Sequence, residues 1–145
     1  MLSADEIATR VGPVLGDFPE IAAAWLFGSF ARGTATLASD VDVAVLLAKR
    51  SDRFLDHERR LRALAARLEA ATGGRDIDLV VLGSQGPIFC HRVLAEGRLV
   101  HDADRERRFD FESYIYTRYF DFQPTYRIAA ESAVEGLKHW LDSRR

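Results

Sequence analysis

Four short runs of residues in the chain have the composition and the flanking residues of β-strands. Residues 21–27 form an unbroken apolar run, and two later runs each begin with aspartates before they become apolar. Short apolar runs bounded by glycine or polar residues are typical of strands buried in a sheet. We expect strands at residues 21–27, 40–47, 75–82 and 98–101, the last of them near a sheet edge.

Segments with helical periodicity separate these strands. The first opens with a capping box, in which the Ser3 hydroxyl and the Glu6 carboxylate satisfy free backbone N–H groups. A later segment has an apolar stripe at helical spacing that consists of Leu61, Leu64, Ala65 and Leu68. The expected helices cover residues 3–15, 52–71, 86–97 and 104–122, with a final helix after Pro124. This order predicts an α/β (α+β) fold, a small mixed β-sheet packed by helices with a C-terminal helical pair.

The helix expected at residues 104–122 has a wide apolar face. Its apolar side chains fall in two adjoining directions, with Phe109, Tyr116 and Phe120 in one and Phe111, Ile115, Tyr119 and Phe122 in the other. A helix that lies on a single sheet usually buries a narrower stripe. Either part of this face contacts another chain, or the final helix covers it.

Composition and charge restrict the class of protein. The chain has 145 residues, 48% of them hydrophobic, which is enough for one domain with a buried core. A net charge of −2 gives no basic footprint for nucleic acid, so small molecules or proteins are the expected partners. A single cysteine excludes an intramolecular disulfide, and no apolar run is long enough to span a membrane. Without a signal segment, we expect a cytoplasmic protein.

Residues 28–42 combine a small-residue turn with two closely spaced aspartates. Strand side chains alternate between faces, so Asp40 and Asp42 should project from the same face. Two like charges beside a sheet core are costly unless a cation satisfies them, which favours a divalent metal. The Gly28-Ser29 turn and a short helix at about residues 30–33 would offer N–H groups and a hydroxyl to an anion. A metal beside a phosphate-binding turn indicates a nucleoside triphosphate site.

The strand expected at residues 75–82 contributes further acids. Asp76 and Asp78 should share one face, while Ile77, Leu79 and Val81 share the other. Asp76 lies at the strand start, where a solvated carboxylate is the simpler interpretation. Asp78 lies inside an apolar strand, where a carboxylate needs a partner.

These residues resemble a known signature. Gly28-Ser29, ten residues and then Asp40-Val41-Asp42 is similar to the G-S-x10-D-x-D signature of the polymerase-beta-like nucleotidyltransferase superfamily. The hexapeptide at residues 28–33 and the tetrapeptide at residues 39–42 most resemble the minimal nucleotidyltransferase (MNT) antitoxins of HEPN/MNT toxin–antitoxin pairs. The resemblance extends from about residue 21 to about residue 124.

The resemblance implies a single nucleotidyltransferase domain over residues 1–145, with a catalytic core at about 20–102 and C-terminal helices at about 104–143. It implies transfer of AMP from ATP to a tyrosine hydroxyl of a cognate HEPN ribonuclease toxin, which silences the toxin and releases pyrophosphate.

The resemblance also implies roles for the site residues. Asp40, Asp42 and Asp78 would be the catalytic residues and would hold Mg²⁺, with two ions expected and Mn²⁺ as an alternative; Asp78 would also take the proton. Gly28 and Ser29 would bind the ATP phosphates. Arg32 would either reach a phosphate or cap the short helix.

Three other functions remain open, and one of them, a structural scaffold subunit, has no support in the sequence. The first is a small-molecule nucleotidyltransferase similar to the aminoglycoside-modifying enzymes, although little of the chain is left to bind such an acceptor. The second is a non-catalytic antitoxin that acts by binding alone, for which a cluster of like-charged carboxylates has no use. The four histidines lack metal-ligand spacing, and we expect structural roles for them and for Cys90.

Overall fold

The structure is a computed structural model that describes residues 1–48 and 54–144, without the side chains of residues 54–56 and 122–133. Its elements are, in order, α1 (Ala4–Gly16), β1 (Ile21–Phe27), α2 (Gly28–Arg32), β2 (Val41–Leu47), α3 (Phe54–Ala71), β3 (Ile77–Val81), the 3-10 helix η1 (Leu82–Ser84), α4 (Pro87–Glu96), β4 (Arg98–Asp102) and α5 (Arg105–Asp142). The alternation of strands and helices predicted from the sequence is confirmed. The predicted start of the third helix at residue 52 lies outside the described residues.

The four strands form one mixed sheet in the order β3-β2-β1-β4. Strand β1 pairs antiparallel with both β2 and β4, whereas β2 and β3 run parallel. The prediction of a small mixed sheet is therefore confirmed, and so is the position of β4 at an edge. The parallel pair matters for the site, because it places the N-terminal ends of β2 and β3 side by side.

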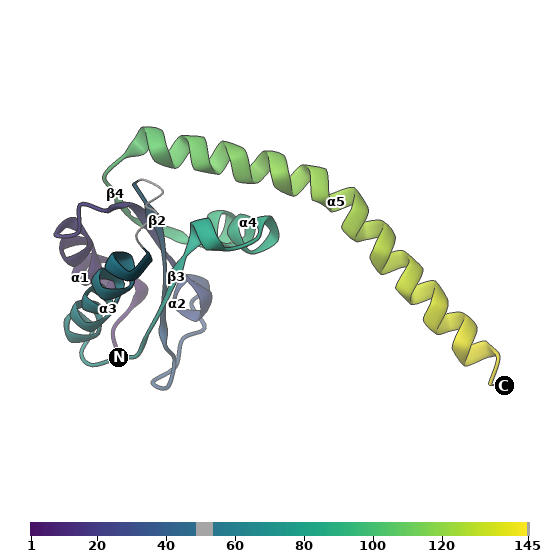
Figure 1. The fold of residues 1–145 in the computed structure, drawn as a ribbon. Helices are drawn as coiled ribbons and strands as arrows, with labels where there is room; N and C mark the ends of the chain where they lie inside the picture. Colours follow the sequence, from purple (N-terminus) through teal and green to yellow (C-terminus); the bar gives the residue numbers. More distant parts are fainter. Residues whose placement is uncertain (49–53, 145) are drawn as a thin grey trace.

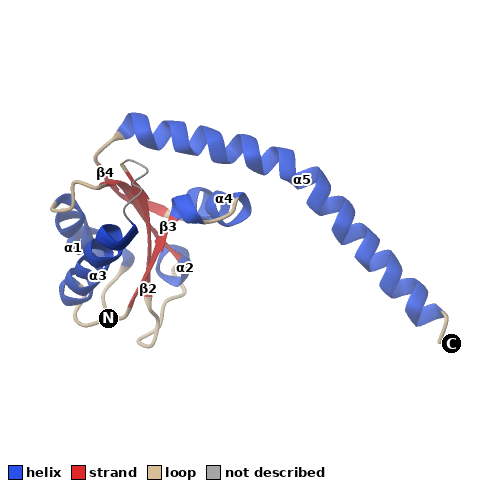
Figure 2. Ribbon diagram, in the orientation of Figure 1, coloured by secondary structure: helices blue, strands red, loops and turns tan. Residues whose placement is uncertain are grey.

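Helices cover both faces of the sheet (Figure 2). Helices α1 and α3 lie on one face, where Ile7, Val11, Leu64 and Leu68 pack against Val43 and Val45. Helices α4 and α5 lie on the other, where Cys90, Val93, Phe111 and Ile115 pack against Trp25 and Leu46. Successive strand residues alternate between these two cores, as the pleat requires. Ile77, Leu79 and Val81 pack against the first core, so the predicted inward face of β3 is confirmed.

Local sequence signals explain where several helices begin. The capping box at α1 is present, because the Ser3 hydroxyl accepts from the Glu6 N–H while the Glu6 carboxylate accepts from the Ser3 N–H. Pro87 lies in the first turn of α4, where its missing N–H costs no helical hydrogen bond. Asp104 caps α5 by accepting from the Arg107 N–H.

The predicted C-terminal helical pair is wrong, because α5 is one continuous helix of 38 residues. Pro124 falls at its middle; proline inside a helix removes one hydrogen bond and bends the helix without necessarily ending it. Figure 1 shows α5 changing direction about midway, with its C-terminal part projecting away from the sheet. The last part of the helix therefore does not fold back over the aromatic face, and Phe109, Tyr114 and Phe120 are exposed.

Among the described residues, none of the helices is both long enough and apolar enough to cross a membrane.

Candidate active site

Two predicted site residues, Asp42 and Asp78, meet across the parallel strands. They are register partners in the β2–β3 ladder, so their side chains leave the sheet on the same face. Phe27 is the register partner of Asp42 on β1, which places that face on the side covered by α4 and α5. The Asp78 carboxyl group is close enough to raise the pKa of Asp42 through its charge and through a side-chain hydrogen bond. A hydrogen bond between two carboxyl groups requires that they share a proton.

This contact changes the protonation of Asp42. The pKa of Asp42 is raised from 3.8 to about 6, first by partial burial and then by the charge and hydrogen bond of Asp78. The charge of Asp40 also raises this pKa, while the Arg32 guanidinium opposes the shift. Paired carboxylates that hold a proton mark a place where a cation is favoured.

Asp40 is the exposed residue directly before β2, and its charge raises the pKa of Asp42. The loop that carries it is held by Arg75, whose guanidinium donates to the Ser39 carbonyl at 3.0 Å and lies over the Phe30 ring. Asp76 is exposed just before β3, consistent with the solvated carboxylate expected from the sequence.

The glycine of the predicted turn lies against Asp42. Gly28 has φ of +69°, and a Cβ atom on it would lie 2.0 Å from Asp42 Oδ2. Only glycine satisfies both the backbone conformation and the close approach. Helix α2 starts at this residue, two residues earlier than expected, so its first N–H groups and Ser29 lie next to the carboxylate pair. The turn predicted to bind phosphate therefore adjoins the acidic side chains.

The donor set suits a hard divalent cation. No group of three or more His, Cys, Asp or Glu side chains within residues 1–48 and 54–144 is already arranged to hold a metal. Asp42 and Asp78 nevertheless supply paired carboxylate oxygens, and Mg²⁺ uses one or two protein carboxylates together with water and substrate phosphate. A divalent cation at this pair would take the place of the shared proton. The residues present therefore fit the metal expected from the sequence.

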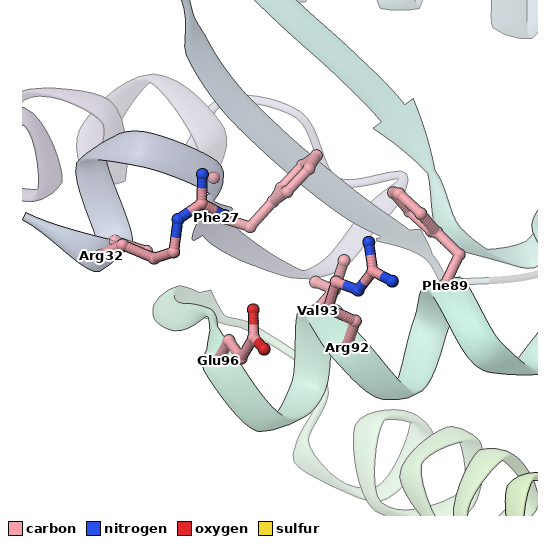
Figure 3. Close-up of a pocket in the computed structure, with 8 residues that line it drawn as sticks. Phe27, Arg32, Phe89, Arg92, Val93 and Glu96 are labelled. Atoms are coloured by element: carbon pink, nitrogen blue, oxygen red, sulfur yellow. The ribbon is translucent and has the colours of Figure 1, made fainter. Parts of the chain in front are cut away.

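A cavity of about 120 Å³ adjoins the turn on the side of α4. Its lining comes from the end of β1, from α2 and from α4, and consists of Phe27, Gly28, Ala31, Arg32, Phe89, Arg92, Val93 and Glu96. Figure 3 shows the two phenylalanine rings near each other at one side of the cavity, and their centroids are 5.8 Å apart at 88°. Gly28 belongs both to this cavity and to the contact with Asp42.

Sequence reasoning did not identify the α4 side of this cavity. Arg92 and Glu96 are four residues apart, a spacing that most often marks a solvated helix face. The sequence indicates that Phe89 lies on the same helix face as Arg92 and Glu96. It does not indicate that this face lies opposite α2.

Cys90 and His91, for which we expected structural roles, both lie in contacts between elements of the fold. Cys90 is buried in the second core, and burial raises the pKa of its thiol to about 11. His91 stacks on Tyr119, with ring centroids 3.6 Å apart, and joins α4 to α5.

Sequence comparison identifies related proteins. The profile of the family described as "Polymerase beta, Nucleotidyltransferase" matches residues 10–106, which include the turn and every aspartate of the site. A curated relative, the protein adenylyltransferase MntA of Shewanella oneidensis, is 35% identical over 82 residues. That alignment covers 57% of this chain and 55% of the relative, so the match spans about half of that protein.

Solved structures extend the similarity to most of the chain. A toxin–antitoxin complex with AMP-PNP contains a chain that is 26% identical, with a TM-score of 0.68 and coverage of 88% of this chain and 98% of that one. A second structure, of a tri-AMPylated Shewanella oneidensis HEPN toxin with an MNT antitoxin, matches with a TM-score of 0.64. Its identity is 23%, over 90% of this chain and 98% of that one, so it supports the fold alone.

Proposed function

Because the chain belongs to the polymerase beta nucleotidyltransferase family, we propose that it is an antitoxin that transfers AMP from ATP to a tyrosine hydroxyl of a HEPN toxin. The observation that carries the proposal is the contact of Asp42, the register partner of Asp78, with the backbone of Gly28. It joins an acidic group suited to a metal with a turn suited to phosphate. The similarity to a protein adenylyltransferase and to a toxin–antitoxin chain crystallised with AMP-PNP supports the same chemistry.

The chain's own residues define where the substrates react. The N–H groups at the start of α2 and the Ser29 hydroxyl bind the β- and γ-phosphates, which leaves the α-phosphate above Asp42 and Asp78. The acceptor hydroxyl attacks the α-phosphorus, and the bond from phosphorus to the bridging oxygen breaks. Its electron pair leaves with pyrophosphate. Asp78 is exposed at the strand end and takes the proton of the acceptor hydroxyl.

Asp40, Asp42 and Asp78 would hold Mg²⁺, which would neutralise the triphosphate charge and lower the pKa of the attacking hydroxyl. We propose two ions, with Mn²⁺ as a possible replacement. The proton shared by Asp42 and Asp78 must leave before both carboxylates can act as ligands, because only ionised oxygens bind the cation well.

A tyrosine acceptor suits this site. The phenol pKa of about 10 is low for a hydroxyl, so an aspartate has less proton affinity to overcome than with a serine. Around Asp42 the structure has strand ends and a turn at the surface, with Asp40 and Asp78 exposed. A partner protein can therefore present the nucleophile and much of its own positioning.

The experiment is to incubate the full chain with its HEPN partner, α-labelled ATP and Mg²⁺, and to locate the label by mass spectrometry. We expect AMP on a tyrosine of the partner and none with Asp42→Asn. An AMP adduct found only on this chain, for example on Tyr114 or Tyr116, would contradict the proposed acceptor. Toxin inhibition without any label transfer would instead indicate an antitoxin that acts by binding alone.

A further inference from the structure

Two arginines from different helices face the cavity between α2 and α4. Arg32 on α2 and Arg92 on α4 both line this cavity together with Glu96, and Figure 3 shows the Arg32 guanidinium near Phe27 and the Arg92 guanidinium on the side of Phe89. Within the described part of the chain, neither guanidinium group forms an ion pair or a side-chain hydrogen bond. This contrasts with Arg60, Arg67, Arg98 and Arg108, each of which is paired with a carboxylate.

The arginines of the cavity suit an anion with several oxygens. The lining contains two guanidinium groups and one carboxylate, and the Arg32 guanidinium also acts on the nearby Asp42 carboxylate, whose pKa it lowers. The fork of N–H donors on each guanidinium matches phosphate oxygens well. The remaining lining is apolar, from Phe27, Phe89 and Val93, whereas Arg32, Arg92 and Glu96 are exposed at the cavity mouth.

The position of the cavity identifies the anion. Gly28 lines the cavity and also touches the Asp42 carboxylate, so the cavity begins where the proposed α-phosphate site ends. A triphosphate whose α-phosphate lies above Asp42 and Asp78 can extend along the start of α2 into this space. The group that arrives there is the β,γ-diphosphate, which later leaves as pyrophosphate.

We propose that Arg92, together with Arg32, binds the β,γ-diphosphate of the nucleoside triphosphate and stabilises the pyrophosphate that leaves. This inference rests on the proposed nucleotidyl transfer and adds a residue of α4 to it. When the bond to the α-phosphorus breaks, negative charge grows on the departing diphosphate, and the two guanidinium groups stabilise that charge. Glu96 has the opposite effect, because its carboxylate weakens diphosphate binding and promotes product release.

The test measures binding of inorganic pyrophosphate, in Mg²⁺, to the full chain by calorimetry. Arg92→Gln should weaken this binding about tenfold, the effect expected for loss of a charge-assisted hydrogen bond. Glu96→Gln should strengthen it about threefold, because it removes the repelling charge. Neither substitution should change the affinity for AMP. Arg59→Gln is the matched control, since Arg59 is an exposed arginine on α3, on the opposite face of the sheet.

Opposite effects of the two α4 substitutions separate diphosphate binding from a structural role, which would weaken binding in both variants. Melting curves establish that each variant is folded, and Arg92→Lys should recover part of the affinity. Wild-type affinity of Arg92→Gln for pyrophosphate would overturn the inference, and so would equal losses for pyrophosphate and AMP.

AMP transfer is measured on the same samples. If the wild-type chain binds pyrophosphate as described but transfers no AMP, the proposed function fails and the diphosphate site remains.

Discussion

A Cβ atom placed on Gly28 would lie 2.0 Å from Oδ2 of Asp42, so the backbone of the turn touches the carboxylate directly. The contact ties two parts of the site that are 14 residues apart in the sequence. A side chain on Gly28, in the turn that we propose binds phosphate, would therefore displace the carboxylate. The contact also makes Gly28 a sensitive position for testing the site.

Gly28→Ala should lower AMP transfer at least tenfold. The added methyl group would push the Asp42 carboxylate out of position, and misplaced catalytic groups cost large factors in rate. The positive φ of +69° should also lower stability by about 1 kcal/mol.

Gly33→Ala separates the effect of conformation from the effect of contact. Gly33 has a similar φ of +73°, but nothing lies within 4 Å of its Cβ position. We expect a comparable loss of stability, about 1 kcal/mol, with transfer retained. Equal loss of transfer in both alanine variants would contradict the role assigned to the Gly28–Asp42 contact.

Without metal, the stability of the protein should fall as the pH rises from 4 to 6. The pKa of Asp42 is raised in the folded state from 3.8 to about 6, so the folded protein binds the proton more tightly than the unfolded chain. The stabilisation is complete below pH 4 and is lost as pH rises through 6. We expect about 1 kcal/mol, because solvent screens this half-buried carboxyl. Chemical denaturation in EDTA at several pH values measures it.

Asp42→Asn should remove this pH dependence and abolish AMP transfer, while its stability at pH 7 in EDTA equals or exceeds that of the wild type. The amide removes one of two repelling charges and still hydrogen-bonds to Asp78. Asp76→Asn is the control, because Asp76 is exposed outside the pair and should change neither property. A variant at Asp42 with full transfer would rule out the assigned site.

The sequence was sufficient to predict most of the elements and the acidic face, because both depend on local periodicity. Two aspartates one residue apart at the start of an apolar run indicate a shared face wherever the strand lies. The order of the strands in the sheet cannot be predicted from such local patterns. The pairing of Asp42 with Asp78 depends on β3 lying parallel beside β2, which residue spacing does not determine.

Two features were not predicted from the sequence. Pro124 favoured a helix boundary, yet α5 continues through it, because loss of one hydrogen bond does not outweigh the others in a long helix. Arg92 and Glu96 have the spacing of a solvated pair, and they line a cavity only because α4 packs opposite α2.

ATP should raise the melting temperature only when Mg²⁺ or Mn²⁺ is present. Without the cation, the triphosphate would approach Asp40, Asp42 and Asp78 as like charges. With the cation, a ligand at a hundredfold excess over Kd stabilises the folded state by about 2.7 kcal/mol. Differential scanning fluorimetry with ATP in Mg²⁺ and in EDTA gives the comparison. An equal rise in EDTA would show that the nucleotide binds without the acidic pair.

Truncation of two phenylalanines of α5 should change the free energy of unfolding by very different amounts. Phe111 is 6% exposed and packs with Trp25 and Ile115, so Phe111→Ala should lower the free energy of unfolding by about 3 kcal/mol. Phe120 is 62% exposed on the same helix, and Phe120→Ala should change it by less than about 0.5 kcal/mol. Urea denaturation at constant pH measures both. A large loss in Phe120→Ala would mean that its ring is buried in solution, as it would be if α5 folded back at Pro124 into the helical pair predicted from the sequence.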